Sequence, residues 1–241
     1  MNIVILAAGK GTRMQSTLPK VLMPLAGRAL VIHVLDTLKH FKKTKTILIV
    51  GYEQEKVREA TRNYDVSYAE QLEQKGTGHA VQMTVPYLDQ NLSETLILCG
   101  DVPLIKAETL DKLLKEHHQN KAQATILTTE LLDAGTYGRI VRNADRSVQK
   151  IVEFKDASES EKKIKEINSG IYVYDTKLLI KALKDLKPTN AQKEYYLTDC
   201  IEILKNQGHK VAAYCTKDDR EVAGVNTLTD LAELEKLFVQ N

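Results

Sequence analysis

A loop near the N-terminus contains residue types that suit a phosphate ligand. It reads Leu6-Ala7-Ala8-Gly9-Lys10-Gly11-Thr12-Arg13-Met14 and directly follows a short apolar run. Its two glycines allow the backbone to turn sharply and to approach a ligand closely, so that backbone N–H groups can surround phosphate oxygens. Arg13 and Lys20 add a guanidinium fork and an ammonium point charge. On its own, the loop fits a phosphate-binding loop and a plain turn equally well.

Two common glycine-loop motifs do not fit this segment. A dinucleotide-binding fingerprint needs a third glycine, but Met14 occupies that position. A Walker A loop needs Gly-Lys-Ser/Thr after its spacer, and that tripeptide is absent. A plain NAD-binding domain is therefore disfavoured.

Two further positions carry oxygen ligands suited to a hard cation. Asp101 follows an apolar run and Gly100, where a carboxylate could hold Mg²⁺, although it could also form a turn before Pro103. Asn226 precedes Thr227-Leu-Thr-Asp230, which has the pattern of a capping box for the last helix. If Thr227 is the cap, the Asn226 amide oxygen is available for a metal; the alternative is that Asn226 itself caps the helix.

Hydrophobic patterning indicates the elements that position these residues. Apolar runs predict buried strands at 3–6, 47–50 and 96–99, and a further strand is predicted at 66–71. Helices are predicted at 29–40, 53–62, 78–89 and around Leu110–Leu114. After residue 124 strands dominate, at 124–131, 137–142, 147–153 and 168–174, followed by helices at 176–186 and 195–207, a strand at 210–216 and a last helix. This order predicts a doubly wound α/β sheet with antiparallel strands laid against its edge.

Composition excludes several classes of function. The 241 residues carry a formal net charge of only +2, which does not indicate a nucleic-acid or membrane partner. The three cysteines are far apart, which argues against a zinc site and for reduced thiols in a cytoplasmic protein. No apolar run is long enough for a membrane span.

Several motifs occur together in one order along the chain. They are the first loop, Pro19-Lys20, Gln71, Gly76-Thr77-Gly78-His79-Ala80, Gly100-Asp101-Val102-Pro103-Leu104, Tyr137-Gly138-Arg139-Ile140, Ile151-Val152-Glu153, Glu166-Ile167-Asn168, Glu194-Tyr195-Tyr196-Leu197-Thr198-Asp199 and Gly224-Val225-Asn226. Over essentially all 241 residues the chain closely resembles the uridyltransferase domain of bacterial N-acetylglucosamine-1-phosphate uridyltransferases. The first loop is shared by many sugar-nucleotide pyrophosphorylases, whereas the later motifs are specific to this family.

The resemblance implies a fold, a reaction and a set of site residues. The fold is a Rossmann-like, doubly wound mixed sheet of the nucleotide-diphospho-sugar transferase type with an antiparallel sugar-binding subdomain. It forms one domain, 1–241, with a nucleotide-binding part at about 1–123 and 210–241 and a sugar-binding part at about 124–209. The reaction joins UTP and N-acetyl-α-D-glucosamine 1-phosphate to give UDP-N-acetylglucosamine and pyrophosphate.

The residue roles that the resemblance implies fall into four groups. Ala8, Gly9, Gln71, Gly76 and Thr77 hold the uridine, and Leu6, Ala7, Cys99 and Gly100 are further substrate-binding residues. The catalytic residues Arg13 and Lys20 hold the triphosphate and the departing pyrophosphate. Asp101 and Asn226 bind Mg²⁺, and Gly138, Glu153 and Asn168 contact the amino sugar.

The chain departs from the family in a few places. Cys99 stands where an aromatic residue is familiar, and Ser169 stands where threonine is common. Many members continue into a β-helix of hexapeptide repeats that acetylates glucosamine 1-phosphate and drives trimer formation. The chain has no such repeat, so we expect no acetyltransferase activity and a monomer or weak dimer.

Two alternative functions follow from the same residues. The chemistry could use another sugar 1-phosphate, such as glucose 1-phosphate, or another nucleotide, such as dTTP. A non-catalytic subunit that only binds sugar nucleotides would be expected to lose the metal carboxylate or the lysine. Asp101 and Lys20 are both present, which disfavours that class.

Overall fold

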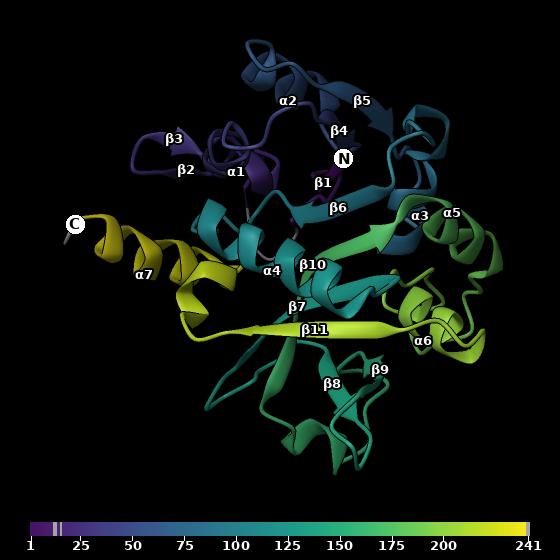
Figure 1. Ribbon diagram of the computed structural model, residues 1–241. Coiled ribbons are helices and arrows are strands. Elements are labelled where there is room, and N and C mark those ends of the chain that lie inside the picture. The colour runs from purple at the N-terminus through teal and green to yellow at the C-terminus, as the bar shows by residue number, and fades with distance from the viewer. Residues whose placement is uncertain (12–13, 15, 240–241) are drawn as a thin grey trace.

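The computed structural model describes residues 1–11, 14 and 16–239, and within them a nine-stranded sheet forms the centre of the molecule (Figure 1). Its strands are β1 (Asn2–Leu6), β4 (Lys45–Val50), β5 (Ser67–Glu70), β6 (Glu94–Cys99), β7 (Ala124–Glu130), β8 (Arg139–Arg142), β9 (Val148–Val152), β10 (Glu166–Asp175) and β11 (Val211–Thr216). The main path runs β11-β7-β10-β6-β1-β4-β5, and the β8–β9 hairpin joins it through β10. β10 is antiparallel to both neighbours, whereas the other pairs on the main path are parallel, so the predicted mixed α/β sheet is confirmed.

Strand register brings three strand ends to the same edge of the sheet. Leu6, the last residue of β1, pairs with Ile49 on β4 and with Cys99 on β6. The loops that follow these parallel strands therefore leave the sheet side by side. Ligands of open α/β sheets bind at this carboxyl edge, which places the first loop next to Asp101.

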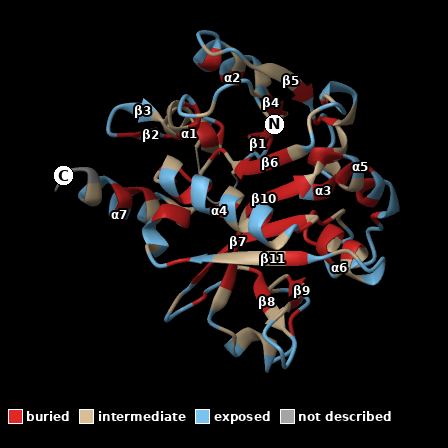
Figure 2. Ribbon diagram, in the orientation of Figure 1, coloured by how far each residue is buried: buried red, intermediate tan, exposed pale blue. Residues whose placement is uncertain are grey.

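Helices cover both faces of the sheet. They are α1 (Leu30–Leu38), α2 (Gln54–Thr61), α3 (Thr77–Gln82), α4 (Ala107–Asn120), α5 (Thr176–Asp185), α6 (Asp199–Asn206) and α7 (Leu228–Val239). On β1, Val4 packs in the hydrophobic cluster with α3, α5 and α6, whereas Ile3 and Ile5 pack on the opposite face with α1, α2 and α4. This alternation explains why the whole run is apolar, because both of its faces are buried (Figure 2).

The last helix packs away from the main sheet. Leu231 and Leu234 of α7 contact a third hydrophobic cluster with Leu25 and Leu30, beside the small hairpin of β2 (Pro24–Leu25) and β3 (Arg28–Ala29). Since Asn226 lies just before α7, this packing anchors the loop that carries it.

Two helix predictions and one sheet prediction are partly wrong. The helix expected over 78–89 ends at Gln82 and is followed by a 3-10 turn at Val85–Tyr87, which contains the N–H-lacking Pro86. The helix expected from residue 195 begins at Asp199, because the backbone at Tyr195 pairs instead with the segment before α3. The later strands do not all lie antiparallel at the edge: β10 inserts between β6 and β7, and β11 is parallel to β7.

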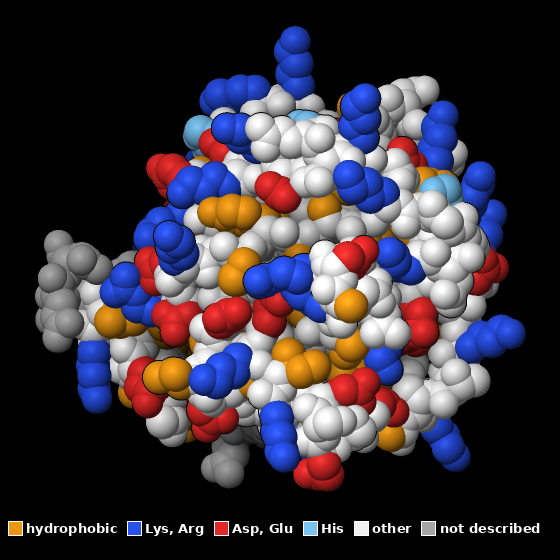
Figure 3. Space-filling view, turned by 60° about the horizontal axis from the view of Figure 1, so that its bottom comes forward, with side chains coloured by type: hydrophobic (Ala, Val, Ile, Leu, Met, Phe, Trp, Pro, Cys, Tyr) orange, Lys and Arg blue, Asp and Glu red, His pale blue; other side chains and the backbone are white. Residues whose placement is uncertain are grey.

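The surface shows no single dominant charge on the face seen in Figure 3, where basic and acidic side chains are interspersed. This distribution agrees with the small net charge of +2. Among the described residues, no helix is long and apolar enough to cross a membrane.

Candidate active site

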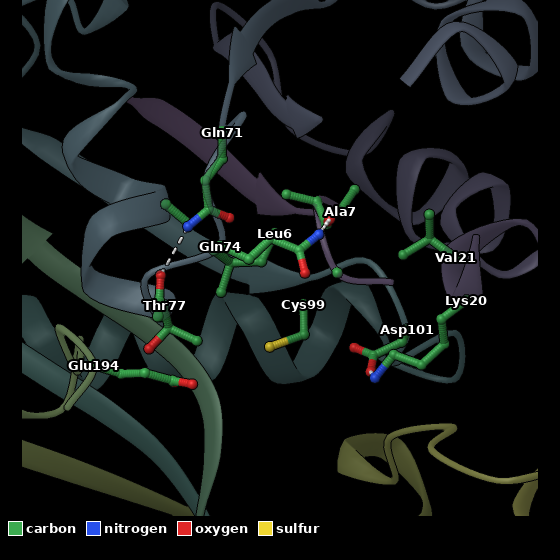
Figure 4. Close-up of a pocket in the computed structure, with 14 residues that line it drawn as sticks. Leu6, Ala7, Lys20, Val21, Gln71, Gln74, Thr77, Cys99, Asp101 and Glu194 are labelled. Atoms are coloured by element: carbon green, nitrogen blue, oxygen red, sulfur yellow. Dashed lines mark hydrogen bonds and ion pairs between the residues drawn. The ribbon is translucent and has the colours of Figure 1, made fainter. Parts of the chain in front are cut away.

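A pocket of about 380 Å³ opens at the carboxyl edge of the sheet, beside the ends of β1 and β6 (Figure 4). Its lining residues are Leu6, Ala7, Ala8, Gly9, Lys20, Val21, Gln71, Gln74, Gly76, Thr77, Ala80, Cys99, Asp101 and Glu194. Ten of these fourteen were predicted as site residues from the sequence. They come from five separate stretches of the chain, so the pocket exists only because the sheet gathers the strand ends.

Three polar side chains converge at one side of this pocket. Lys20 begins the 3-10 helix Lys20–Leu22, and its ammonium forms an ion pair with Asp101. The same Lys20 Nζ lies 3.1 Å from the Asn226 side-chain oxygen, to which it donates a hydrogen bond. Figure 4 shows the Lys20 and Asp101 side chains meeting at the edge of the pocket.

Backbone contacts hold the three residues in place. The Val225 N–H donates to the Asp101 carbonyl over 2.9 Å, which joins the end of β6 to the loop before α7. At Gly11, where φ is +65°, an added Cβ would come within 2.6 Å of the Lys20 Cβ. The first loop therefore needs glycine there to pack this closely against the lysine.

The capping box before α7 forms as predicted. The Asp230 N–H donates to the Thr227 hydroxyl over 3.1 Å, and an Asp230 carboxylate oxygen accepts from the Thr227 and Asn226 N–H groups, both over 2.8 Å. Thr227 is thus the cap, and the alternative that Asn226 caps the helix is wrong. The Asn226 amide faces Lys20 instead.

The donor set fits a hard divalent cation. A carboxylate and an amide oxygen both point at one position, and the Lys20 ammonium that lies there is a cationic stand-in for a metal ion. Among the described residues, no group of three or more His, Cys, Asp or Glu side chains could hold a metal. Asp101 and Asn226 would therefore supply two ligands, leaving the other positions to water and phosphate oxygens, as is common for Mg²⁺.

The far side of the pocket is built by the loop between β5 and α3. The Gln71 side-chain nitrogen donates to the Gly76 carbonyl over 3.0 Å. The Thr77 hydroxyl accepts from the Leu197 N–H over 3.1 Å, so this hydroxyl fastens the segment before α6 to α3. Gln74 donates to the Ala8 carbonyl over 2.8 Å and joins this loop to the first loop.

Four pocket residues were missed by sequence reasoning: Val21, Gln74, Ala80 and Glu194. Ala80 and Glu194 lie within motifs noted in the sequence, and Val21 directly follows Lys20. Membership of those motifs is a signal for Ala80 and Glu194, and adjacency to Lys20 is a weaker signal for Val21. Gln74 lies outside the motifs, and its residue type alone does not indicate a ligand contact.

The residues predicted for the amino sugar form a separate cluster. A Cβ added at Gly138 would lie 3.4 Å from a Glu153 carboxylate oxygen and 3.5 Å from the Asn168 Cβ. Asn168 precedes an irregularity in the β10 ladder, and its side-chain nitrogen donates to the Tyr172 hydroxyl over 2.7 Å. Glu153 borders a hollow of about 390 Å³ that Phe154 and Tyr196 also line.

Burial changes the acidity of Glu153. Loss of solvent raises the pKa of this carboxyl above its ordinary value, although the Thr198 hydroxyl donates to it over 3.1 Å. Since Thr198 lies in the segment fastened by Thr77, one segment touches both the pocket and the Gly138–Glu153–Asn168 cluster.

Residues 2–233 match the family model described as nucleotidyl transferase. The chain belongs to the nucleotidyl transferase family. Among its relatives, the bifunctional protein GlmU of Exiguobacterium sibiricum (strain DSM 17290) is 51% identical over 232 residues, which are 96% of this chain and 51% of that protein. The bifunctional protein GlmU of Bacillus subtilis (strain 168) is 46% identical over 235 residues, 98% of this chain and 51% of that protein. The chain thus spans about half the length of these curated relatives, and they confirm the resemblance seen in the motifs.

A solved structure confirms the transferase fold. The crystal structure of UDP-glucose pyrophosphorylase complexed with UDP-glucose superposes with a TM-score of 0.79, covering 99% of this chain and 98% of that one. Its sequence identity is 16%, so the likeness concerns the fold. Nucleotidyl transferases of this type generally use a divalent metal ion and act on small molecules.

Arg13, Gly100 and Lys10 are not among the described residues that line the pocket. Arg13, predicted to hold the triphosphate, lies outside the described residues. Gly100 does not line the pocket; its N–H donates to the Leu6 carbonyl over 2.9 Å and ties β6 to β1. Lys10 places its ammonium 5.2 Å from the centre of the Tyr52 ring.

Proposed function

We propose that this nucleotidyl transferase joins UTP and N-acetyl-α-D-glucosamine 1-phosphate to form UDP-N-acetylglucosamine and pyrophosphate. The observation that carries the proposal is the convergence of Lys20, Asp101 and Asn226 at the side of a pocket on the carboxyl edge of the sheet. The motif resemblance to the uridyltransferases and the similarity to GlmU proteins support the choice of substrates.

The two substrates are assigned to the two clusters of the site. Ala8, Gly9, Gln71, Gly76 and Thr77 hold the uridine in the pocket, with Leu6, Ala7 and Cys99 lining it. The nucleotide-binding part comprises about 1–123 and 210–241, and the sugar-binding part about 124–209. These assignments rest on the resemblance and on the proximity of the residues.

A contact between the two parts supports this arrangement. The Gly224 N–H donates to the Tyr137 hydroxyl over 3.3 Å, and Tyr137 directly precedes Gly138. A Cβ added at Gly224 would lie 3.9 Å from an Asp101 carboxylate oxygen. The cluster of Gly138, Glu153 and Asn168 is thus joined, through Tyr137, to the loop that carries Asn226.

The reaction chiefly requires that charge be neutralised. A phosphate oxygen of the sugar phosphate attacks the α-phosphorus of UTP in line, and both reactants are anions. The acceptor phosphate is already ionised at neutral pH, so no general base is needed. Mg²⁺, when bound at Asp101 and Asn226, supplies positive charge to the reacting phosphates. Lys20 and Arg13 stabilise the pyrophosphate as it leaves.

The amino sugar is oriented by Glu153 and Asn168. The partly buried Glu153 carboxylate borders the hollow and can accept hydrogen bonds from sugar hydroxyls there. The Asn168 amide is held by Tyr172 and by the Gly170 N–H, which donates to its oxygen over 3.2 Å. Holding both side chains in this way keeps the acceptor positioned for attack.

A grid of substrates tests the proposal. Pyrophosphate release is measured with UTP, dTTP or CTP against N-acetylglucosamine 1-phosphate or glucose 1-phosphate, with and without Mg²⁺. We expect the highest kcat/KM for UTP with N-acetylglucosamine 1-phosphate and turnover only with the metal. A higher kcat/KM for glucose 1-phosphate or dTTP would establish the alternative substrates, and binding without any turnover would indicate a non-catalytic protein.

Two properties of the chain stay predictions. A cytoplasmic location is expected from its sparse, separated cysteines, which are free in the structure. A monomer or weak dimer is expected in solution, and light scattering that detects a stable trimer would contradict it.

A further inference from the structure

The Gln71 side chain is held from two directions. It is 4% exposed and lies directly after β5, where its backbone N–H donates to the Val50 carbonyl over 2.8 Å. Its side-chain nitrogen, Nε2, lies 3.0 Å from the Gly76 carbonyl oxygen and 3.1 Å from Nδ1 of His79. Figure 4 shows the nitrogen directed at the start of α3 and the oxygen directed away from it.

These two contacts determine which way the amide points. A backbone carbonyl can only accept a hydrogen bond, so the nitrogen and not the oxygen of Gln71 must face Gly76. The second Nε2 hydrogen then points at Nδ1 of His79, which must accept it. His79 is consequently neutral and carries its proton on Nε2.

This orientation leaves the Gln71 oxygen, Oε1, for a ligand. Among the described residues, none donates a hydrogen bond to it, although Gln71 is buried and lines the pocket. An acceptor at this position is complementary to the N3–H of uracil. Cytosine presents a lone pair at N3 and would meet the oxygen with like polarity.

We propose that His79 is a positioning residue that selects uridine over cytidine by holding the Gln71 amide in this orientation. The inference rests on the proposed function, because it takes UTP as the nucleotide. His79 itself does not line the pocket, so it acts through Gln71. Nδ1 of His79 accepts from the Gln71 nitrogen, and a donor at this point would oppose the amide orientation that the Gly76 carbonyl requires.

The surroundings of His79 favour its neutral form. The charged or titratable groups that face it are Lys75 and Glu73 in the preceding loop and Tyr195, whose ring centre is 6.3 Å away. Burial lowers the pKa of His79 below its ordinary value of 6.5, and Lys75 lowers it further. The acceptor form is therefore present at neutral pH.

Protonation of His79 would disrupt the arrangement. A proton on Nδ1 would face the Gln71 nitrogen, donor against donor. Turning the amide over would relieve that contact but place the Gln71 oxygen against the Gly76 carbonyl. The KM for UTP should consequently rise on the acid side of pH 6.5.

Two substitutions distinguish the effect of the Nδ1 acceptor of His79 from the effect of its ring size. His79→Phe keeps a ring beside Tyr195 but has no acceptor, whereas His79→Asn can place its side-chain oxygen where Nδ1 lies and cannot titrate. The measurement is kcat/KM for UTP and for CTP with N-acetylglucosamine 1-phosphate, and the KM for UTP from pH 5 to 8. We expect His79→Phe to lower the UTP/CTP ratio at least ~10-fold, mainly through the KM for UTP.

The conservative variant makes the test decisive even if His79→Phe folds poorly. His79→Asn should restore discrimination and should lack the rise in KM at acid pH. An unchanged UTP/CTP ratio in folded His79→Phe, or the same acid rise in His79→Asn, would overturn the inference. Failure of the proposed function is distinguishable, because the wild-type protein would then not turn over UTP at all or would prefer another nucleotide.

Discussion

Lys20 and Asn226, which are 206 positions apart in the chain, meet through a 3.1 Å hydrogen bond from the lysine ammonium to the amide oxygen. The same ammonium pairs with Asp101, so one cation contacts both of the oxygen donors that are proposed to bind metal. A divalent cation at this place would displace the lysine from both. The released ammonium would then be available for the triphosphate.

This relationship predicts two opposite effects of removing the lysine. Lys20→Ala should lower kcat at least ~100-fold, the scale of losing one electrostatic stabiliser in phosphoryl transfer. Without nucleotide, however, the variant should bind a divalent cation more tightly, since the competing ammonium is gone. Titration with Mn²⁺ followed by electron paramagnetic resonance measures this affinity. The exposed Lys112→Ala is the control, and weaker Mn²⁺ binding by Lys20→Ala would contradict the competition.

Asp101 supplies the only carboxylate of the proposed metal pair. Asp101→Ala should also lose at least ~100-fold in kcat, because the charge that attracts the cation is removed. Its Mn²⁺ affinity should fall, in contrast to that of Lys20→Ala. Pyrophosphate release and the same Mn²⁺ titration measure the two effects. Near-normal turnover by this variant would refute the proposed role.

Much of the framework could be predicted from local sequence. Runs such as Ile3–Leu6 and Ile47–Val50 are apolar at every position because both faces of the central sheet are covered. The Thr227–Asp230 capping box was visible because it depends on residues four positions apart or fewer. The glycine after the first apolar run and the aspartate after the fourth indicated the correct edge of the sheet.

Features that depend on distant parts of the chain could not be predicted in this way. The place of β10 between β6 and β7 is decided by long-range strand pairing, which leaves no local pattern. The late start of α6 has a similar cause: the Tyr195 N–H donates to the Lys75 carbonyl over 2.8 Å, and the Gly78 N–H donates to the Tyr195 carbonyl over 2.7 Å. The role of Gln74 depends on the Ala8 carbonyl, 66 positions away, and that of His79 depends on a loop conformation that returns Gln71 to it.

The docking of Tyr195 against the start of α3 can be tested at Gly76. This residue has φ of +106°, and an added Cβ would lie 2.5 Å from the Tyr195 carbonyl oxygen. Gly208 also has a positive φ, +82°, but an added Cβ would meet nothing within 4 Å. Both alanine variants bear backbone strain, but Gly76, with ψ of 172°, lies in a region that is essentially restricted to glycine, so its larger loss combines this strain with the close approach.

We expect Gly208→Ala to lower the free energy of unfolding by about 1 kcal/mol and Gly76→Ala by about 2–4 kcal/mol. Gly76→Ala should also raise the KM for UTP, because Gln71 bonds to the Gly76 carbonyl. Urea unfolding and initial-rate kinetics measure the two quantities. Equal destabilisation by both substitutions would mean that the contact with Tyr195 has no energetic weight.

Asp199, the first residue of α6, makes stability depend on pH. Burial, followed by the nearby carboxylates of Glu202, Glu153 and Asp156, raises its pKa from 3.8 to about 6. The folded protein therefore binds this proton more tightly than the unfolded chain does. The contribution of Asp199 to the free energy of unfolding is greatest below pH 3.8 and falls as the pH rises to about 6. Above that pH the loss of stability caused by the buried charge stays constant.

Replacing the carboxylate by its neutral isostere should remove that deficit. Asp199→Asn is expected to raise the free energy of unfolding at pH 7 by roughly 1 kcal/mol and to leave it nearly unchanged at pH 3.5. Urea unfolding at pH 3.5, 5 and 7 measures the difference between variant and wild type. Asp65→Asn, at an exposed position between α2 and β5, controls for the amide substitution itself. A variant that is less stable than wild type at pH 7 would show that the α6 N-terminus favours the charged form more strongly than burial opposes it.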